Sequence, residues 1–109
     1  MATKDPREPF TRISAQEAKD KIDGGAQIVD VRTPGEYTGG HVPGAINIPH
    51  MSIVARKGEL ATDKELVFIC QVGQRSALAA EFAAASGFKD LYNVEGGTDA
   101  WVKAGYGVE

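Results

Sequence analysis

Short apolar runs alternate along this chain with stretches that carry helix signals, and this alternation is the feature that most constrains the fold. The predicted strands lie at residues 10–13, 27–31, 45–48, 65–69 and 91–94. Continuous apolar runs of this length are typical of strands that are buried on both faces of a parallel sheet. The sequence therefore predicts an α/β fold, with a mainly parallel sheet of about five strands and helices on both faces.

Two of the stretches between the predicted strands begin with a capping box, in which a serine or threonine is followed three residues later by glutamate. These are Ser14-Ala15-Gln16-Glu17 and Thr33-Pro34-Gly35-Glu36. The second also has proline at the first helical position, where no N–H is needed. A pair of glycines that can end a helix follows each stretch. The pattern predicts helices over residues 15–23 and 34–37.

Two more helices are predicted further along the chain. Residues 76–86 are rich in alanine, with Leu78 and Phe82 four positions apart on one face, and residues 98–104 begin with a threonine that can cap a helix. A glycine directly follows each stretch and can close it. The segment over residues 50–60 has no clear period, and we expect one helical turn and a loop there.

The length of the chain fits one domain. With 109 residues, 42% of them hydrophobic, it can bury about two-thirds of the surface that the unfolded chain exposes. Residues 1–9 are polar and include two prolines, so we predict a flexible tail there and a single domain over residues 10–108. No internal repeat or linker divides that domain.

The balance of charge excludes several classes of partner. A net charge of −3 with 25% charged residues gives no general attraction for phosphate backbones or anionic lipid, so we expect neither nucleic acid nor membrane partners. No stretch approaches the ~20 apolar residues of a membrane span. The first residues, MATKDPREPF, lack the apolar core of a signal peptide. We therefore expect a cytoplasmic protein.

The chain contains one cysteine, Cys70, and two histidines, His41 and His50. A single cysteine cannot form an internal disulfide. The three side chains together also fall short of the ligand sets that hold structural zinc. We expect a free thiol and no metal site.

Cys70 directly follows the predicted strand at residues 65–69 and precedes the predicted helix at residues 76–86. Ligands of parallel sheets bind at the carboxyl ends of strands, so Cys70 lies where this fold places its site. The loop can direct its backbone N–H groups at one point, and the helix amino terminus adds roughly half a positive charge. Gly73 can adopt the positive φ that such a loop needs.

These features predict a thiolate at Cys70. The helix end and Arg75 both favour the charged sulfur and lower the thiol pKa from about 8.5. Ser76 can cap the helix or donate its hydroxyl to the sulfur, and Arg75 can face an incoming oxyanion or a carboxylate of the fold. The competing interpretation is a cysteine that only packs as a small buried hydrophobe. Its position after a strand, with Gly73 and Arg75 behind it, favours a nucleophile that acts on a small anion.

Three segments carry a family signature. They are DVRTPGEY with GHVPGAINIP at residues 30–37 and 40–49, CQVGQRS at residues 70–76, and EGG with Trp101 and GYGV at residues 95–97 and 105–108. Together they resemble the rhodanese family of single-domain sulfurtransferases. The resemblance covers about residues 10–108 and implies a rhodanese-like fold.

The resemblance also implies a reaction, that of a thiosulfate sulfurtransferase. Cys70 would attack the outer sulfur of thiosulfate or a related small anionic donor, release sulfite and hold the sulfur as a persulfide. Cyanide or a thiol, including a protein thiol, would then accept the sulfur, and no metal or organic cofactor is implied. The persulfide would be held by the backbone N–H groups of Gln71, Val72, Gly73, Gln74, Arg75 and Ser76.

Two other functions stay open. Phosphatases and arsenate reductases also use cysteine and arginine on one loop, but their sites resemble Cys-x5-Arg, whereas four residues separate Cys70 from Arg75. The shorter loop favours a single sulfur atom over a phosphate ester. A non-catalytic interaction module of the same fold would usually lack the cysteine, which is present here.

Polar residues near the other strand ends have both a structural and a functional interpretation. Asp30, Arg32 and Glu36 are expected to support neighbouring loops and not to touch substrate, with Arg32 and Glu36 as the most obvious ion pair. His41 lies in a turn and is expected to bond to backbone, although histidine can also act as a general base near neutral pH.

Three further residues have an alternative interpretation in which they contact a partner or attract substrate. Trp101 is expected to be a packing anchor, with an exposed partner-binding aromatic as the alternative. Arg56 and Lys57 form an adjacent basic pair that could attract anionic donors to the mouth of the site. The simpler expectation for this pair is a solvated surface.

Overall fold

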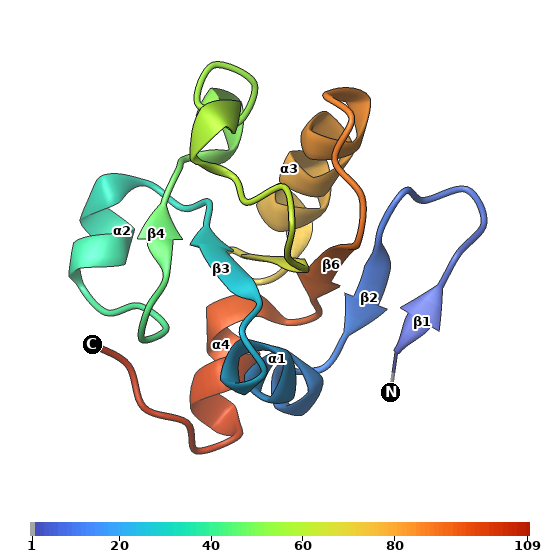
Figure 1. Ribbon diagram of the computed structural model, residues 1–109. Coiled ribbons are helices and arrows are strands. Elements are labelled where there is room, and N and C mark those ends of the chain that lie inside the picture. Colours follow the sequence, from blue (N-terminus) through green and yellow to red (C-terminus); the bar gives the residue numbers. More distant parts are fainter. Residues whose placement is uncertain (1) are drawn as a thin grey trace.

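A six-stranded sheet forms the centre of the protein in the computed structural model, which describes residues 2–109 (Figure 1). The strands are Thr3–Lys4 (β1), Thr11–Ile13 (β2), Gln27–Asp30 (β3), Ile46–Asn47 (β4), Leu66–Ile69 (β5) and Leu91–Val94 (β6). Their order across the sheet is β1-β2-β6-β5-β3-β4. All neighbours pair in parallel except β1 and β2, which are antiparallel. The predicted α/β fold with a mainly parallel sheet is confirmed.

Helices cover both faces of this sheet. They are α1 (Ala15–Asp23), α2 (Pro34–Thr38), α3 (Gln74–Ala85) and α4 (Gly97–Lys103), with short 3₁₀ turns η1 (His50–Ser52) and η2 (Lys57–Glu59). Ala80 of α3 packs in one buried cluster with Phe68. Ala18 of α1 and Trp101 of α4 pack in a second cluster with Val67. The sheet therefore separates α3 from α1 and α4.

The central strand β5 sets the direction of the cysteine. Leu66 and Phe68 belong to the cluster on the α3 face, whereas Val67 and Ile69 belong to the cluster on the other face. Alternation of this kind follows from the two-residue period of a strand. Cys70 continues the alternation and lies in the cluster on the α3 face.

Both predicted capping boxes are present. The hydroxyl of Ser14 accepts the N–H of Glu17, and the Glu17 carboxylate accepts the N–H of Ser14. Thr33 and Glu36 make the same pair of hydrogen bonds at the start of α2. As a result α1 occupies the predicted residues 15–23, and α2 ends one residue beyond its predicted end.

Three local features differ from the sequence prediction. The sequence did not indicate β1, which lies in the predicted flexible tail and pairs with β2; Met1 of that tail lies outside the described residues. α3 begins at Gln74, before the predicted start at Ser76, because Gly73 takes a φ of 103° and turns the loop directly into the helix. Residues 50–60 contain two 3₁₀ turns instead of one helical turn.

Candidate active site

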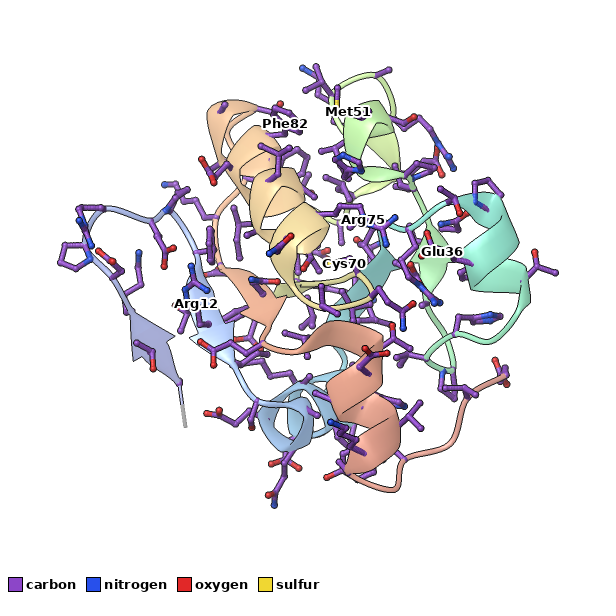
Figure 2. All side chains as sticks on the ribbon, turned by 180° about the vertical axis from the view of Figure 1, so that it is seen from behind. Arg12, Glu36, Met51, Cys70, Arg75 and Phe82 are labelled. Carbon is purple, nitrogen blue, oxygen red and sulfur yellow. The ribbon has the colours of Figure 1, made fainter. Side chains whose placement is uncertain are left out.

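Cys70 lies between β5 and α3, at the carboxyl end of the central strand (Figure 2). The residue is only 1% exposed. The backbone N–H of Gly73 donates to its Sγ at 3.0 Å, and the Ser76 Oγ lies 3.3 Å from Sγ. The sulfur is therefore shielded from bulk water and is contacted by hydrogen-bond donors.

Two opposing influences set the pKa of the Cys70 thiol. Burial is the largest single influence and raises the pKa. The hydroxyl of Ser76 and the backbone N–H groups of Ser76, Gly73 and Val72 lower it, because they stabilise the thiolate. Together the donors outweigh burial, so the pKa of Cys70 lies below the ordinary value of a cysteine.

Gly73 gives the loop its shape. At a φ of 103° its N–H points toward Sγ, and a Cβ at this position would lie 3.3 Å from the carbonyl oxygen of Val94 and 3.4 Å from the nitrogen of Gly96. Both the backbone angle and the close approach of the end of β6 and the residues after it favour glycine here. Val72, next to it, directs its side chain outward and is 53% exposed.

Asn93 supports this loop from β6. It is fully buried, its Nδ2 donates to the carbonyl oxygen of Gly73 at 3.1 Å, and its Oδ1 accepts the Ser76 hydroxyl at 2.5 Å. One amide therefore contacts both the loop and the helix that contribute donors to Cys70.

The start of α4 holds the loop from the other side. The backbone N–H and the hydroxyl of Thr98 both donate to the carbonyl oxygen of Cys70, at 2.8 and 2.9 Å. Asp99 donates its N–H to the carbonyl oxygen of Gln71. Gly97 allows this approach, since a Cβ there would lie 2.4 Å from the Cys70 oxygen.

Arg32 pairs with Asp30, so the predicted pair of Arg32 with Glu36 is wrong. The Arg32 Nη2 lies 2.7 Å from an Asp30 carboxylate oxygen, and both side chains are buried. Residues two apart on an extended segment point the same way, which brings these groups together at the end of β3. The remaining donors of Arg32 contact Oε1 of Gln71 at 3.0 Å and the carbonyl oxygen of Gly40 at 2.7 Å.

Glu36 instead pairs with Arg75, and Figure 2 shows both residues near Cys70. Two parallel hydrogen bonds of 2.8 and 3.0 Å join the guanidinium to the carboxylate. The Arg75 guanidinium is the main reason that the pKa of Glu36 falls from 4.5 to about 2. Of the two orientations considered for Arg75, the structure has the one that faces a carboxylate of the fold.

Comparisons with known proteins identify the family of this chain. The family model of the rhodanese-like domain matches residues 14–104. The chain belongs to the rhodanese family. Thiosulfate sulfurtransferase GlpE of Pseudomonas paraeruginosa is 36% identical to this chain over 92 residues, which are 84% of each chain.

Two further relatives show how widely the match extends. The uncharacterized protein YqhL of Bacillus subtilis is 43% identical over 76 residues, and the match covers 70% of this chain but only 60% of that protein. A rhodanese-related protein from Thermoplasma volcanium, whose crystal structure is known, is 35% identical in sequence. Its structure superimposes with a TM-score of 0.82 over 90% of this chain and 96% of that one. The fold is therefore that of rhodanese-like domains.

Outside the loop, His41 and Trp101 lie as predicted. The Nδ1 of His41 lies 2.9 Å from the carbonyl oxygen of Tyr37, and the two rings stack with centroids 3.8 Å apart. Trp101 is 3% exposed, and its Nε1 donates to the carbonyl oxygen of Gly107 at 2.9 Å. The expectations of a backbone-bonded histidine and a packing tryptophan are confirmed.

The basic pair, Arg56 and Lys57, lies on the surface at the start of η2. Arg56 pairs with Glu59 at 2.7 Å, and both side chains are more than 40% exposed. Lys57 is exposed as well. These contacts match the simpler expectation of a solvated surface.

Other features of the described residues lie away from the thiol. A depression of about 560 Å³ is lined by residues 61–65 and 86–90, at the amino ends of β5 and β6. Among residues 2–109, no group of three or more potential ligands from histidine, cysteine, aspartate and glutamate could hold a metal ion. Nor does any helix in that range have the length and apolar character to cross a membrane.

Sequence reasoning missed Asn93 and Thr98 as neighbours of the cysteine. The signal for Asn93 was available: it is the polar residue in the run LYNV, at a position that the strand period buries. For Thr98 the sequence indicates only a cap for its own helix. Its contact with the Cys70 carbonyl depends on how α4 packs against the loop, which the local sequence does not specify.

Proposed function

We propose that this rhodanese is a thiosulfate sulfurtransferase, which moves sulfane sulfur from thiosulfate or a related donor to a thiol or cyanide through a persulfide on Cys70. The observation that carries the proposal is the convergence of the Gly73 N–H and the Ser76 hydroxyl on Sγ. Donors placed in this way stabilise negative charge on sulfur without reorganising during the reaction. Relatives named thiosulfate sulfurtransferase support the assignment.

In the first step, the Cys70 thiolate attacks the outer sulfur of thiosulfate. A new sulfur–sulfur bond forms to Sγ, the sulfur–sulfur bond of thiosulfate breaks, and sulfite leaves with the electron pair of that bond. The enzyme now carries Cys70 as a persulfide, whose outer sulfur bears the negative charge. No proton has to be removed once the thiolate is present.

In the second step, an acceptor attacks the outer sulfur of the persulfide. Cyanide leaves as thiocyanate, or a thiolate leaves as a persulfide of its own, and the bond to Sγ breaks with its electron pair on Cys70. The thiolate is thereby regenerated. A protein thiol is an acceptor of the same chemistry, and a reducing compartment such as the cytoplasm suits an enzyme that needs its cysteine reduced.

The backbone of the loop has a defined part in this proposal. The first N–H groups of α3 have no partners within the helix, so they are available to an anion. The groups proposed to hold the persulfide are the backbone N–H groups of Gln71, Val72, Gly73, Gln74, Arg75 and Ser76. Removing one such donor from an active site typically costs about 2.7–4 kcal/mol in transition-state stabilisation.

Three side chains are proposed to support the loop without touching substrate. Asp30 holds Arg32, which reaches Gln71, the residue after the nucleophile. Glu36 holds Arg75 at the amino end of α3. The positive charge of Arg75 still lies close enough to interact with the Cys70 thiolate.

The test compares sulfite release from thiosulfate with phosphate release from an aryl phosphate, and adds mass spectrometry of the protein after donor treatment. We expect sulfite release, no phosphate release, and a gain of about 32 Da that maps to Cys70. Cys70→Ser should keep the fold and lose both turnover and the mass gain. Full thiosulfate activity in Cys70→Ser, or phosphate release in its place, would contradict the proposal.

A further inference from the structure

The Ser76 hydroxyl contacts two groups, but it can donate a hydrogen bond to only one of them at a time. Its Oγ lies 2.5 Å from Oδ1 of Asn93 and 3.3 Å from Sγ of Cys70. A serine hydroxyl carries one proton and can donate one full hydrogen bond. The oxygen must therefore donate to one neighbour and accept from, or merely contact, the other.

The orientation of Asn93 decides which neighbour receives the proton. Its Nδ2 donates to the carbonyl oxygen of Gly73, which places Oδ1 toward Ser76. Since Oδ1 carries no hydrogen, that contact is a hydrogen bond only when Ser76 donates. While Cys70 is a thiol, its S–H can donate in turn to Ser76 Oγ, and the three groups form one chain of donors and acceptors.

Ionisation of Cys70 reverses this preference. The thiolate has no proton to give and accepts a charge-assisted hydrogen bond, which is stronger than a neutral one. When the hydroxyl turns to the sulfur, the fully buried Oδ1 loses this donor, and a buried acceptor without a partner costs free energy.

We propose that Asn93 is a positioning residue that holds the Ser76 proton while Cys70 is a thiol and yields it when the sulfur becomes anionic. The inference rests on the proposed function, in which both the thiolate and the persulfide are anionic. Asn93 opposes formation of the thiolate through its Oδ1, while its Nδ2 keeps the loop in place. Its net effect on Cys70 therefore depends on the presence of Ser76.

The charged groups around the sulfur do not change their own charge when Cys70 ionises, so they do not reproduce the effect of Asn93. Arg75 at the start of α3 is paired with Glu36 of α2, and Arg32 after β3 is paired with Asp30. Arginine stays protonated in proteins, and the Glu36 carboxyl has a pKa of about 2. The Arg75–Glu36 pair therefore keeps both its charges while the thiol titrates.

A double-mutant cycle separates the two roles of Asn93. The assay is the pH midpoint of Cys70 alkylation in the wild type, Asn93→Leu, Ser76→Ala and the double variant. Leucine removes the amide in both backgrounds, so any loosening of the loop through the Gly73 carbonyl cancels in the cycle. Asn93→Leu shifts the alkylation midpoint by one amount in the protein that keeps Ser76 and by another in Ser76→Ala. We expect the shift in the protein that keeps Ser76 to be lower by about one pH unit. Equal effects in the two backgrounds would overturn the proposal.

A second measurement needs no substitution at Asn93. The chain has two asparagines, so labelling the side-chain carbonyl carbon of asparagine gives an NMR signal for Asn93 and an internal control from Asn47. Asn47 donates to the carbonyl oxygens of Asp30 and Arg32 and does not contact Ser76 in the described structure. We expect the Asn93 signal to move with the alkylation midpoint of Cys70 while the Asn47 signal stays in place.

The same spectrum of Ser76→Ala isolates the hydroxyl. The thiolate charge remains in this variant, but no hydroxyl can move, so the Asn93 shift should shrink severalfold. Two results would refute the exchange of the proton. One is an Asn93 signal that does not change when Cys70 of the wild type ionises, and the other is an Asn93 signal that shifts equally in Ser76→Ala. Neither measurement uses a sulfur donor. A protein that shows the exchange but releases no sulfite would therefore refute only the proposed function.

Discussion

Replacement of Gly97 by alanine tests whether the start of α4 sets the position of the active-site loop. Gly97 has a φ of 56°, and a Cβ there would lie 2.4 Å from the carbonyl oxygen of Cys70 and 2.6 Å from the carbonyl carbon of Gln71. Both are backbone atoms, which cannot swing aside as the tip of a long side chain would. Either the loop or α4 must move.

The expected loss of stability in Gly97→Ala is the sum of two separate free-energy costs. A left-handed φ costs alanine roughly 1–2 kcal/mol, and overpacking at a close contact adds roughly 1–3 kcal/mol. We therefore expect Gly97→Ala to lower the free energy of unfolding by about 2–5 kcal/mol. A shift of about 1 Å in a reacting group can cost on the order of 100-fold in rate, so sulfite release should fall at least about tenfold in the folded fraction.

Gly44→Ala is the matched control. Gly44 also has a positive φ, 84°, but a Cβ there would meet no atom within 4 Å. Urea unfolding and sulfite release would be measured for both variants. Gly44→Ala should lose roughly 1–2 kcal/mol and keep its turnover. If Gly97→Ala behaves like Gly44→Ala in both assays, close packing of α4 does not position the loop.

Three other substitutions have defined outcomes. The folded pKa of Glu36 is about 2, below the ordinary 4.5, so its stabilisation is present above about pH 4.5 and is lost as the pH falls toward 2. After allowance for its partial exposure, Glu36→Gln should remove about 1 kcal/mol of this acid-dependent stability. The free energy of unfolding would be measured across that pH range, with Glu59→Gln as an exposed control. Arg75→Ala should lower kcat/KM by about tenfold, because a cation near the sulfur is lost; unchanged kinetics with reduced stability would make Arg75 purely structural. Trp101→Phe should lose about 1–2 kcal/mol in thermal unfolding, because the hydrogen bond to Gly107 disappears, with turnover close to wild type; a large loss of turnover would contradict a packing role.

Local signals in the sequence were sufficient for much of the fold. Capping boxes are closed within four residues, and the predicted box at Ser14 gave α1 its observed bounds. The position of Cys70 was also predictable, because it follows directly from the end of β5. Both features depend on residues that are neighbours along the chain.

Features that depend on distant residues were not predictable in the same way. Arg75 meets Glu36 across 39 positions, and Ser76 meets Asn93 across 17. Closeness in sequence favours Arg32 as the partner of Glu36, whereas the fold brings Arg75 to Glu36 in space. The contacts that hold the loop can therefore be identified only once α2, β6 and α4 have been placed around β5.

The most direct test of the account is the rate of Cys70 alkylation as a function of pH. The chain has one cysteine, so every alkylated molecule reports on this sulfur. The account predicts an inflection below the value of a free cysteine, about 8.5, because donors of the loop outweigh burial. An inflection at or above that value would show that burial dominates and that the loop does not stabilise a thiolate.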